Sequence, residues 1–248
     1  QNLINIEQDD KVKAFICTQD LKDEDYINNH YVIMATKMGQ VKKTSLEQYS
    51  RPRSNGINAI TIKDGDELLE AKLTNGNSQI MLAVKSGKAI RFEESKTRPM
   101  GRNASGVRGI RLKDNKDEVV GMISVNDMDA NILVVSENGY GKRSSLEDYR
   151  LTNRGGKGVK TISITTKTGQ LVSLKSVTDS DDLMIINKSG IAIRMQVADL
   201  RVMGRATQGV KVISIKDGDG IAAVAKVMND EEEIEDINDI EFTGDTIK

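Results

Sequence analysis

The sequence predicts an all-β protein: a propeller-like disc of repeated four-stranded blades, about five of them in this chain. A glycine followed by a hydrophobic residue and a strand-like segment occurs at residues 56, 106, 158 and 209, at intervals of 50, 52 and 51 residues. A fixed period of this size indicates a repeat architecture. Short β-branched segments dominate, and no helical period is sustained. Aromatic residues make up only 3% of the chain, which favours narrow, tightly packed blades.

Each repeat contains two strand pairs at constant offsets. In the first pair, an Ile-x-Ile segment and a polar turn follow the glycine, and the second strand is expected at residues 12–16, 68–73, 119–125, 171–177 and 221–227. The second pair is a hairpin whose first strand is an apolar run at residues 32–35, 80–83, 132–135 and 183–186. Its turn ends in a glycine, where a tight turn needs a positive φ: Gly39, Gly87, Gly139 and Gly190.

Four-stranded units of this length cannot bury both faces alone, so they are expected to pack radially. We assign one domain to residues 1–228, with repeats at approximately 11–66, 67–118, 119–170 and 171–220. Residues 3–6 match the Ile-x-Ile segments, which predicts a partial first repeat and a seam where residues 1–16 meet 213–228. Two consecutive β-sandwiches are the alternative, against which the constant period argues.

The formal charge of −1 hides a segregation of charge along the chain. Residues 229–248 carry nine acids and one base, which leaves 35 bases and 28 acids, or +7, in the rest. A basic body with an acidic tail is typical of a protein that binds a polyanion and carries a competitor. We expect the tail to be disordered or loosely docked, and its deletion after Met228 to tighten binding of that polyanion. A tail that only aids solubility is the alternative.

Basic residues recur at equal offsets around each glycine. One set lies four residues before it: Arg102, Arg154 and Arg205. Another lies two residues after it: Arg108, Lys160 and Lys211. Equal offsets in a ring of similar blades predict a positive belt around the rim. Duplex DNA suits such a belt, because phosphates supply affinity that is independent of sequence, and glycines let backbone N–H groups approach them.

The candidate DNA-binding set adds the bases that follow the hairpin turns, the other loop bases and the glycines of the third loop. Its members are Lys42, Lys43, Arg51, Arg53, Arg91, Arg98, Arg102, Arg108, Lys142, Arg143, Arg150, Arg154, Gly155, Gly156, Lys157, Gly158, Lys160, Arg194, Arg201, Arg205 and Lys211.

The composition argues against a catalytic or metal site in this chain. His30 is the only histidine, so neither a Ser-His-Asp set nor a histidine metal cluster is plausible. Tyr49 and Tyr149 share an offset that Leu200 takes in the last repeat, which indicates packing. Cys17 is the only cysteine, which favours a reducing cytoplasm. No apolar run approaches a membrane span, and we expect no cofactor.

Three segments resemble a known family. The loop 154–158, the segment 139–143 and the stretch 98–112 are similar to the C-terminal domain of bacterial DNA gyrase A, a type IIA topoisomerase, and residues 55–68 also fit. The resemblance covers the chain to about residue 228. It implies a six-bladed β-pinwheel whose blades exchange strands and whose rim wraps DNA to support ATP-dependent negative supercoiling. It further implies the upstream breakage-rejoining domain and the ATPase gyrase B as partners, and a location at the bacterial nucleoid.

The family's diagnostic box reads Gln-Arg-Arg-Gly-Gly-Lys-Gly in the first blade. The matching segment here, residues 152–158, differs at its first two positions and lies in mid-chain, so we expect the first blade to precede Gln1. The corresponding C-terminal domain of topoisomerase IV is the nearest alternative, but its blades are usually more degenerate. A propeller that binds proteins is the other alternative, and salt-dependent binding to duplex DNA would separate it from the first two.

Overall fold

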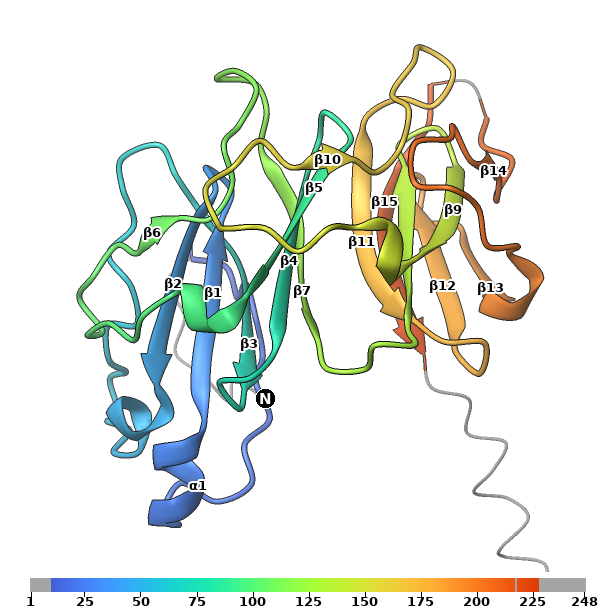
Figure 1. Cartoon of the computed structure of the whole chain (residues 1–248). Coiled ribbons are helices and arrows are strands. Elements are labelled where there is room, and N and C mark those ends of the chain that lie inside the picture. The colour runs from blue at the N-terminus through green and yellow to red at the C-terminus, as the bar shows by residue number, and fades with distance from the viewer. Residues whose placement is uncertain (1–9, 217, 228–248) are drawn as a thin grey trace, which may run out of the picture.

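The computed structural model describes residues 10–216 and 218–227, and the expected acidic tail lies outside them. Strands dominate the described chain (Figure 1). They are β1 Tyr31–Thr36, β2 Gln40–Ser45, β3 Leu68–Thr74, β4 Gln79–Val84, β5 Lys88–Glu93, β6 Val107–Arg108, β7 Val119–Val125, β8 Asn131–Ser136, β9 Tyr140–Ser145, β10 Val159–Lys160, β11 Leu171–Val177, β12 Asp182–Asn187, β13 Ala192–Gln196, β14 Val210–Lys211 and β15 Ile221–Val227. The helices are α1 Glu24–Asn29 and four short 3₁₀ turns, η1 Leu46–Tyr49, η2 Glu94–Lys96, η3 Leu146–Asp148 and η4 Val197–Asp199.

These strands form four antiparallel sheets, which we number as blades along the chain. Blade 1 has the order β3-β1-β2-β6, blade 2 β7-β4-β5-β10, blade 3 β11-β8-β9-β14 and blade 4 β15-β12-β13. The predicted all-β blade architecture is therefore confirmed, and so are the four hairpins with positive φ at their turn glycines. The described residues form four blades where about five were expected, because residues 10–19 contain no strand.

Each of the first three blades is completed by a strand from the following repeat. The two-residue strands β6, β10 and β14 are the Gly-hydrophobic joins, and they pair with β2, β5 and β9 of the blade before. Val107 lies opposite Val41, and Val159 lies opposite Ala89. Because these strands stand at one end of each sheet order, opposite β3, β7 and β11, they close the outer edge of the blade.

The inner strands form the hub. β3 contacts β7, β7 contacts β11, and β11 contacts β15. Backbone hydrogen bonds join each hairpin turn to the hub strand of the next blade: Val119 N–H donates to Lys37 C=O at 2.8 Å, Leu171 to Lys85 at 3.0 Å, and Ile221 to Glu137 at 2.8 Å. The turns of successive blades are therefore held at the same end of the disc, as Figure 1 shows.

The core lies between blades rather than within a closed sandwich. In β4, Ile80 and Leu82 pack toward blade 1, while Met81 and Ala83 pack toward blade 3, and all four are fully buried. A strand buried on both faces has the continuous apolar run seen in the sequence instead of an alternating pattern. The continuous runs at residues 80–83 and 132–135 thus reflect the stacking of blades, whereas the run at 32–35 is covered on one face by the N-terminal segment and the run at 183–186 is only partly buried on one face.

The segments after the glycine joins do not continue as the expected strands. Instead, two successive N–H groups in each segment bind one turn carbonyl: those of Gly109 and Ile110 donate to Gly39 C=O, at 2.8 and 3.3 Å. The N–H groups of Thr161 and Ile162 likewise donate to Gly87 C=O, at 2.8 and 3.4 Å. Ile110 and Ile162 are 1% exposed and fill the gap between blades. The Ile-x-Ile pattern therefore marks a wedge between two sheets.

The N-terminal part of the described chain covers the free face of blade 1. Ala14, Ile16, Leu21 and Tyr26 pack against a cluster that includes Val32 and Met34 of β1. Between Leu21 and β1 the chain forms α1, a helix that the sequence did not predict. Its first turn is capped by Asp23. Residues 10–16 thus lie at the blade 1 end, so the expected seam with residues 213–227 is not formed by the described residues. Within residues 10–216 and 218–227, no helix is long and apolar enough to cross a bilayer.

We predict that alanine replacement will separate an occupied exchange site from an open one. A Cβ at Gly106, φ +88°, would lie 2.6 Å from the carbonyl oxygen of Val41, whereas a Cβ at the matching Gly56, φ +75°, would meet nothing within 4 Å. Gly56→Ala should lower the unfolding free energy by about 1–2 kcal/mol, the cost of a positive φ. Gly106→Ala should lower it by about 3 kcal/mol or more, since strain and overlap add. Urea unfolding of both variants provides the measurement, and equal losses would contradict strand exchange at Gly106.

Candidate nucleic-acid interface

Four basic loops, residues 50–58, 97–106, 149–158 and 200–209, lead from the 3₁₀ turns to the glycine joins. Loops 97–106, 149–158 and 200–209 start in their own blade and end as the outer strand of the preceding blade, so each crosses a blade boundary at the periphery. The rim position predicted from the repeat is therefore occupied by these loops. The first loop has no acceptor strand among the described residues, and Gly56 is open.

Hydrogen bonds join each of the last three basic loops to the segment that follows the preceding loop in the chain. Gly155 N–H donates to Gly109 C=O at 2.6 Å, and Arg111 N–H donates to Gly156 C=O at 2.8 Å. Ser163 N–H reaches Thr207 C=O at 3.1 Å, and Thr61 N–H reaches Ala104 C=O at 3.3 Å. The loops are therefore linked from blade to blade into one continuous belt.

Two of the equally spaced arginines bridge blades within this belt. The guanidinium of Arg154 donates to the carbonyls of Lys96, at 2.9 Å, and Arg108, at 3.0 Å. The guanidinium of Arg205 donates to Lys160 C=O at 2.8 Å. Both side chains are half-buried, as is Arg102. Arg154 and Arg205 thus hold neighbouring loops together. Each donates to the backbone carbonyl of a base from the second recurring set, Arg108 or Lys160.

Most of the remaining loop bases are exposed and form no ion pair within the described residues. Their side chains supply the positive charge of the rim: Arg51, Arg53, Arg98, Arg108, Arg150, Lys157, Lys160, Arg201 and Lys211. Arg194 is exposed as well, but its Nε lies 2.6 Å from Oδ2 of Asp182. Cations without acidic partners remain available to an external polyanion.

Five members of the candidate set are not on the surface, and the expectation of an exposed position is wrong for them. They are Lys42, Lys43, Arg91, Lys142 and Arg143, whose exposure is 9% or less. Their polar groups are bound by the protein itself. Arg91 Nη1 donates to the carbonyls of Leu146, at 2.9 Å, and Tyr149, at 3.0 Å, and Lys142 Nζ donates to Gly204 C=O at 2.6 Å.

The base four residues after the turn glycine fastens the loop of the next repeat. The backbone carbonyls of Lys43, Arg91 and Arg143 accept from Met100, Thr152 and Met203 at 2.8–2.9 Å. The side chains act on the adjoining 3₁₀ turn: Arg91 and Arg143 reach its backbone carbonyls, and Arg143 also pairs with Asp179.

Lys43 differs because the next turn begins with buried Glu94, where the other repeats have Leu or Val. Its Nζ lies 2.8 Å from Oε1 of Glu94, and both side chains are almost fully buried. The buried Glu94 carboxylate needs a cationic partner, whereas Arg91 and Arg143 at the same offset donate to backbone carbonyls.

Lys42 and Lys142, two of the buried lysines, carry lowered pKa values. Burial lowers the pKa of Lys42 to about 8, with a contribution from the Arg102 charge. Burial also lowers the pKa of Lys142 to about 8, with Asp148 opposing the shift and Arg205 adding to it. Since the charged form is disfavoured in the fold, ionisation opposes folding below about pH 8, and this opposition fades as pH rises toward the unfolded pKa. These values fit structural lysines that hold loop carbonyls.

The glycines of the third loop are also engaged by the fold. The N–H of Gly155 is bound to Gly109, and a Cβ at Gly158 would lie 2.5 Å from Ala89 C=O. The expectation that the Gly155 N–H meets phosphate is therefore not supported. These glycines allow the close approach of two blades, while the charge comes from neighbouring side chains such as Lys157.

The polar turns before the hub strands carry exposed lysines that were not among the predicted DNA-binding residues. Asp66 and Asp117 bind hairpin-turn N–H groups, those of Met38 at 2.8 Å and Ser86 at 3.0 Å. Lys63 lies three residues before Asp66, and Lys113 lies four residues before Asp117. Both lysines are exposed, at the edge of the belt. The signal was present, because Lys-Asp stands at the same place in three of the four turns, at residues 63–64, 113–114 and 216–217.

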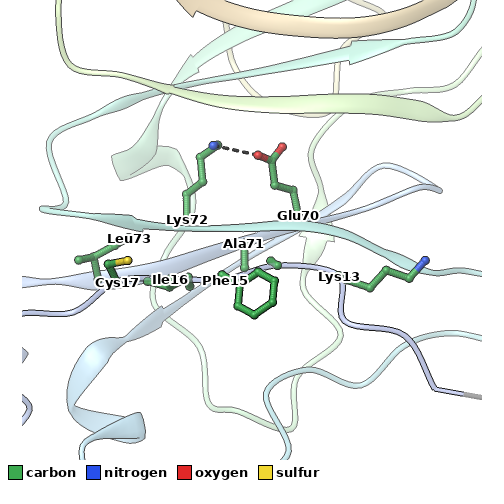
Figure 2. A pocket seen from close by; sticks show the side chains of 9 residues that line it. Lys13, Phe15, Ile16, Cys17, Glu70, Ala71, Lys72 and Leu73 are labelled. Atoms are coloured by element: carbon green, nitrogen blue, oxygen red, sulfur yellow. Dashed lines mark ion pairs between the residues drawn. The ribbon is translucent and has the colours of Figure 1, made fainter. Parts of the chain in front are cut away.

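An open groove of about 570 Å³ lies away from this belt, between residues 13–17 and β3 (Figure 2). Its walls include the exposed Phe15 ring and Cys17, and the charged groups are paired: Lys72 with Glu70 at 2.8 Å, and Lys13 with Glu67 at 2.8 Å. Among the described residues, no group of His, Cys, Asp and Glu is arranged to hold a metal ion. The groove therefore does not share the charge of the rim.

Comparison with known proteins agrees with the geometry. The family model described as "DNA gyrase C-terminal domain, beta-propeller" matches residues 30–75, 79–126, 130–178 and 181–228, one match for each blade. DNA gyrase A of Staphylococcus aureus strain NCTC 8325 is 44% identical over 234 residues, which is 94% of this chain and 26% of that protein. The chain thus spans about a quarter of the length of the curated relatives it matches.

Solved structures show the same architecture. The C-terminal domain of a DNA topoisomerase IV matches with a TM-score of 0.85 and 25% identity, over 96% of this chain and 73% of that one. The C-terminal domain of a DNA gyrase A matches with a TM-score of 0.79 and 24% identity, over 92% and 74%. Four family matches on four blades, together with the sequence identity, establish that the chain belongs to the family of DNA gyrase C-terminal β-propeller domains.

Proposed function

We propose that this domain binds duplex DNA without sequence preference and wraps it around its outer rim, as the C-terminal domain of DNA gyrase A in support of ATP-dependent negative supercoiling. The observation that carries the proposal is the belt of hydrogen-bonded loops whose exposed bases lack acidic partners among the described residues. Phosphate contacts provide affinity without reading bases. Smooth bending of 20–30 base pairs costs about 1–6 kcal/mol, which contacts distributed over several blades can offset.

In this proposal the domain is a non-catalytic part of a type II topoisomerase and needs no cofactor of its own. Its partners are duplex DNA, the breakage-rejoining domain of gyrase A and the ATPase gyrase B, at the nucleoid in the bacterial cytoplasm. The 44% identity to a DNA gyrase A favours this assignment. The equivalent role in topoisomerase IV is the second candidate, favoured by the TM-score of 0.85 to such a domain.

We predict a steep salt dependence that originates in the exchanged strands. The triple variant Arg108→Gln, Lys160→Gln, Lys211→Gln removes one exposed base from each of three blades, and none of the three side chains bonds to another described residue. The slope of log affinity against log salt should become shallower by about 0.9 for each phosphate that is no longer contacted. Fluorescence anisotropy with random-sequence duplex at several salt concentrations measures it. A triple variant with the parental slope and affinity would place the DNA elsewhere.

A pair of single variants should separate fastening bases from binding bases. Arg91→Met removes the guanidinium from the Leu146 and Tyr149 carbonyls and leaves the Tyr149 carbonyl without its donor, so it should lower the unfolding free energy by about 3 kcal/mol, while the folded protein keeps its DNA affinity. Lys157→Met should change stability by less than about 0.5 kcal/mol, because its side chain is exposed, but should weaken binding. Denaturant unfolding and anisotropy on the same samples give both readouts. The reverse pattern would contradict the division into two classes.

Wrapping, as opposed to binding, should change DNA topology. A nicked plasmid ligated in the presence of the domain should acquire a linking difference after the protein is removed, because a superhelical path around the rim adds writhe. The Arg108, Lys160 and Lys211 triple variant should give a smaller difference at the same protein concentration. Binding without any linking difference would contradict superhelical wrapping by this domain.

A further inference from the structure

The two faces of the disc differ in charge. The turn face carries the hairpin turns and the turns before the hub strands, at residues 37–39, 63–67, 85–87, 113–118, 137–139, 165–169, 188–190, 216 and 218–219. The helix face carries α1 and the connections from each hub strand to the next hairpin, at residues 19–29, 75–78, 126–130 and 178–181. Figure 1 shows these two sets at opposite ends of the strands.

The helix face is strongly acidic. Its segments hold eight acids and one base, Lys22, a charge of −7, and the face stays acidic although Arg143 and Lys226 of adjoining strands pair with Asp179 and Asp181. The described turn-face segments hold eight bases and eight acids, which balance. A duplex on the rim is therefore repelled from the helix-face side but not from the turn-face side.

A cleft recurs where the rim meets the turn face. In blade 1 a cleft of about 490 Å³ is lined by the exchanged-strand base Arg108, by Arg111 and by the turn base Lys63. In blade 2 a cleft of about 430 Å³ is lined at the corresponding places by Lys160, by Ser163 and by Lys113, with Lys116 beside it. The same construction in neighbouring blades follows from the repeat.

The carboxylates in these clefts accept hydrogen bonds from backbone N–H groups. In blade 2, Asp117 accepts from Ser86 N–H at 3.0 Å and from Lys113 N–H at 3.1 Å, and Asp114 accepts from Lys116 N–H at 2.9 Å. In blade 1, Asp66 accepts from Met38 N–H at 2.8 Å. The ammonium groups of Lys63 and Lys113 form no ion pair within the described residues, and both side chains are exposed.

We propose that the duplex lies off-centre on the rim, displaced toward the turn face, and that each of these clefts holds a phosphate of its second strand. A duplex presents two phosphate backbones, and the loop bases of the rim form a single row that meets one of them. A second row, offset along the disc axis and present in blades 1 and 2, meets the other backbone. The acidic helix face fixes the direction of the offset, because like charges repel.

This inference rests on the proposed function, and a double variant tests it separately. Lys63→Gln with Lys113→Gln removes one base from each cleft, and neither ammonium group bonds to another described residue. The slope of log affinity against log salt for random-sequence duplex should become shallower by about 1.8, which is 0.9 for each of two phosphates. The control is Lys22→Gln with Met128→Glu, which makes the same net change of charge on the helix face, where Met128 is 51% exposed.

The control should keep the parental slope. Two outcomes overturn the inference alone: a parental slope in the cleft variant, or equal losses in the cleft variant and the control, provided that the Arg108, Lys160 and Lys211 triple variant weakens binding. A parent protein without salt-dependent binding overturns the proposed function together with this inference. Thermal unfolding of each variant confirms that the folded state is retained.

Discussion

The closing of each blade by the next repeat is the constraint on which the rest of the structure depends. A three-stranded sheet in this architecture leaves an outer edge with unpaired backbone groups, and the edge of β2, β5 or β9 is closed by only two residues. Those two residues must approach a neighbouring backbone so closely that a Cβ at Gly106, Gly158 or Gly209 would lie 2.5–2.6 Å from a carbonyl oxygen. The recurring glycine is therefore a requirement of blade-to-blade contact.

Strand exchange also explains why basic residues fall into two classes. The chain must cross from one blade to the previous one at the periphery, and the crossing needs fasteners that can reach carbonyl groups from a buried position. Arg91 and Arg143 do this with guanidinium groups, and Lys42 and Lys142 with ammonium groups. Bases beyond the crossing, such as Arg108 and Lys160, project outward because their strand is the outermost of the sheet.

The basic rim thus results from the same geometry that holds the blades together. Each loop that seals an edge is bonded to the next loop, so side chains at equal offsets are carried at equal positions around the periphery. A stiff, periodic support is suited to a stiff, periodic polyanion, because few contacts must be ordered when it binds. Burial of the fasteners removes them from the exposed charge of the rim, and in the proposed binding mode the acidic connections on the helix face define one side of the DNA path.

The sequence by itself determined the period, the fold class, the four hairpins and the placement of the basic loops on the rim, because glycine turns and continuous apolar runs are local signals. It could not show that residues such as Ile110 and Ile162 form wedges instead of strands, since both structures require a buried β-branched residue. Nor could it separate Arg91 from Arg108, because an arginine reads the same in the sequence whether it meets solvent or a carbonyl 55 residues away. Only the tertiary structure decided which bases are buried, because burial depends on the blade that the next repeat supplies.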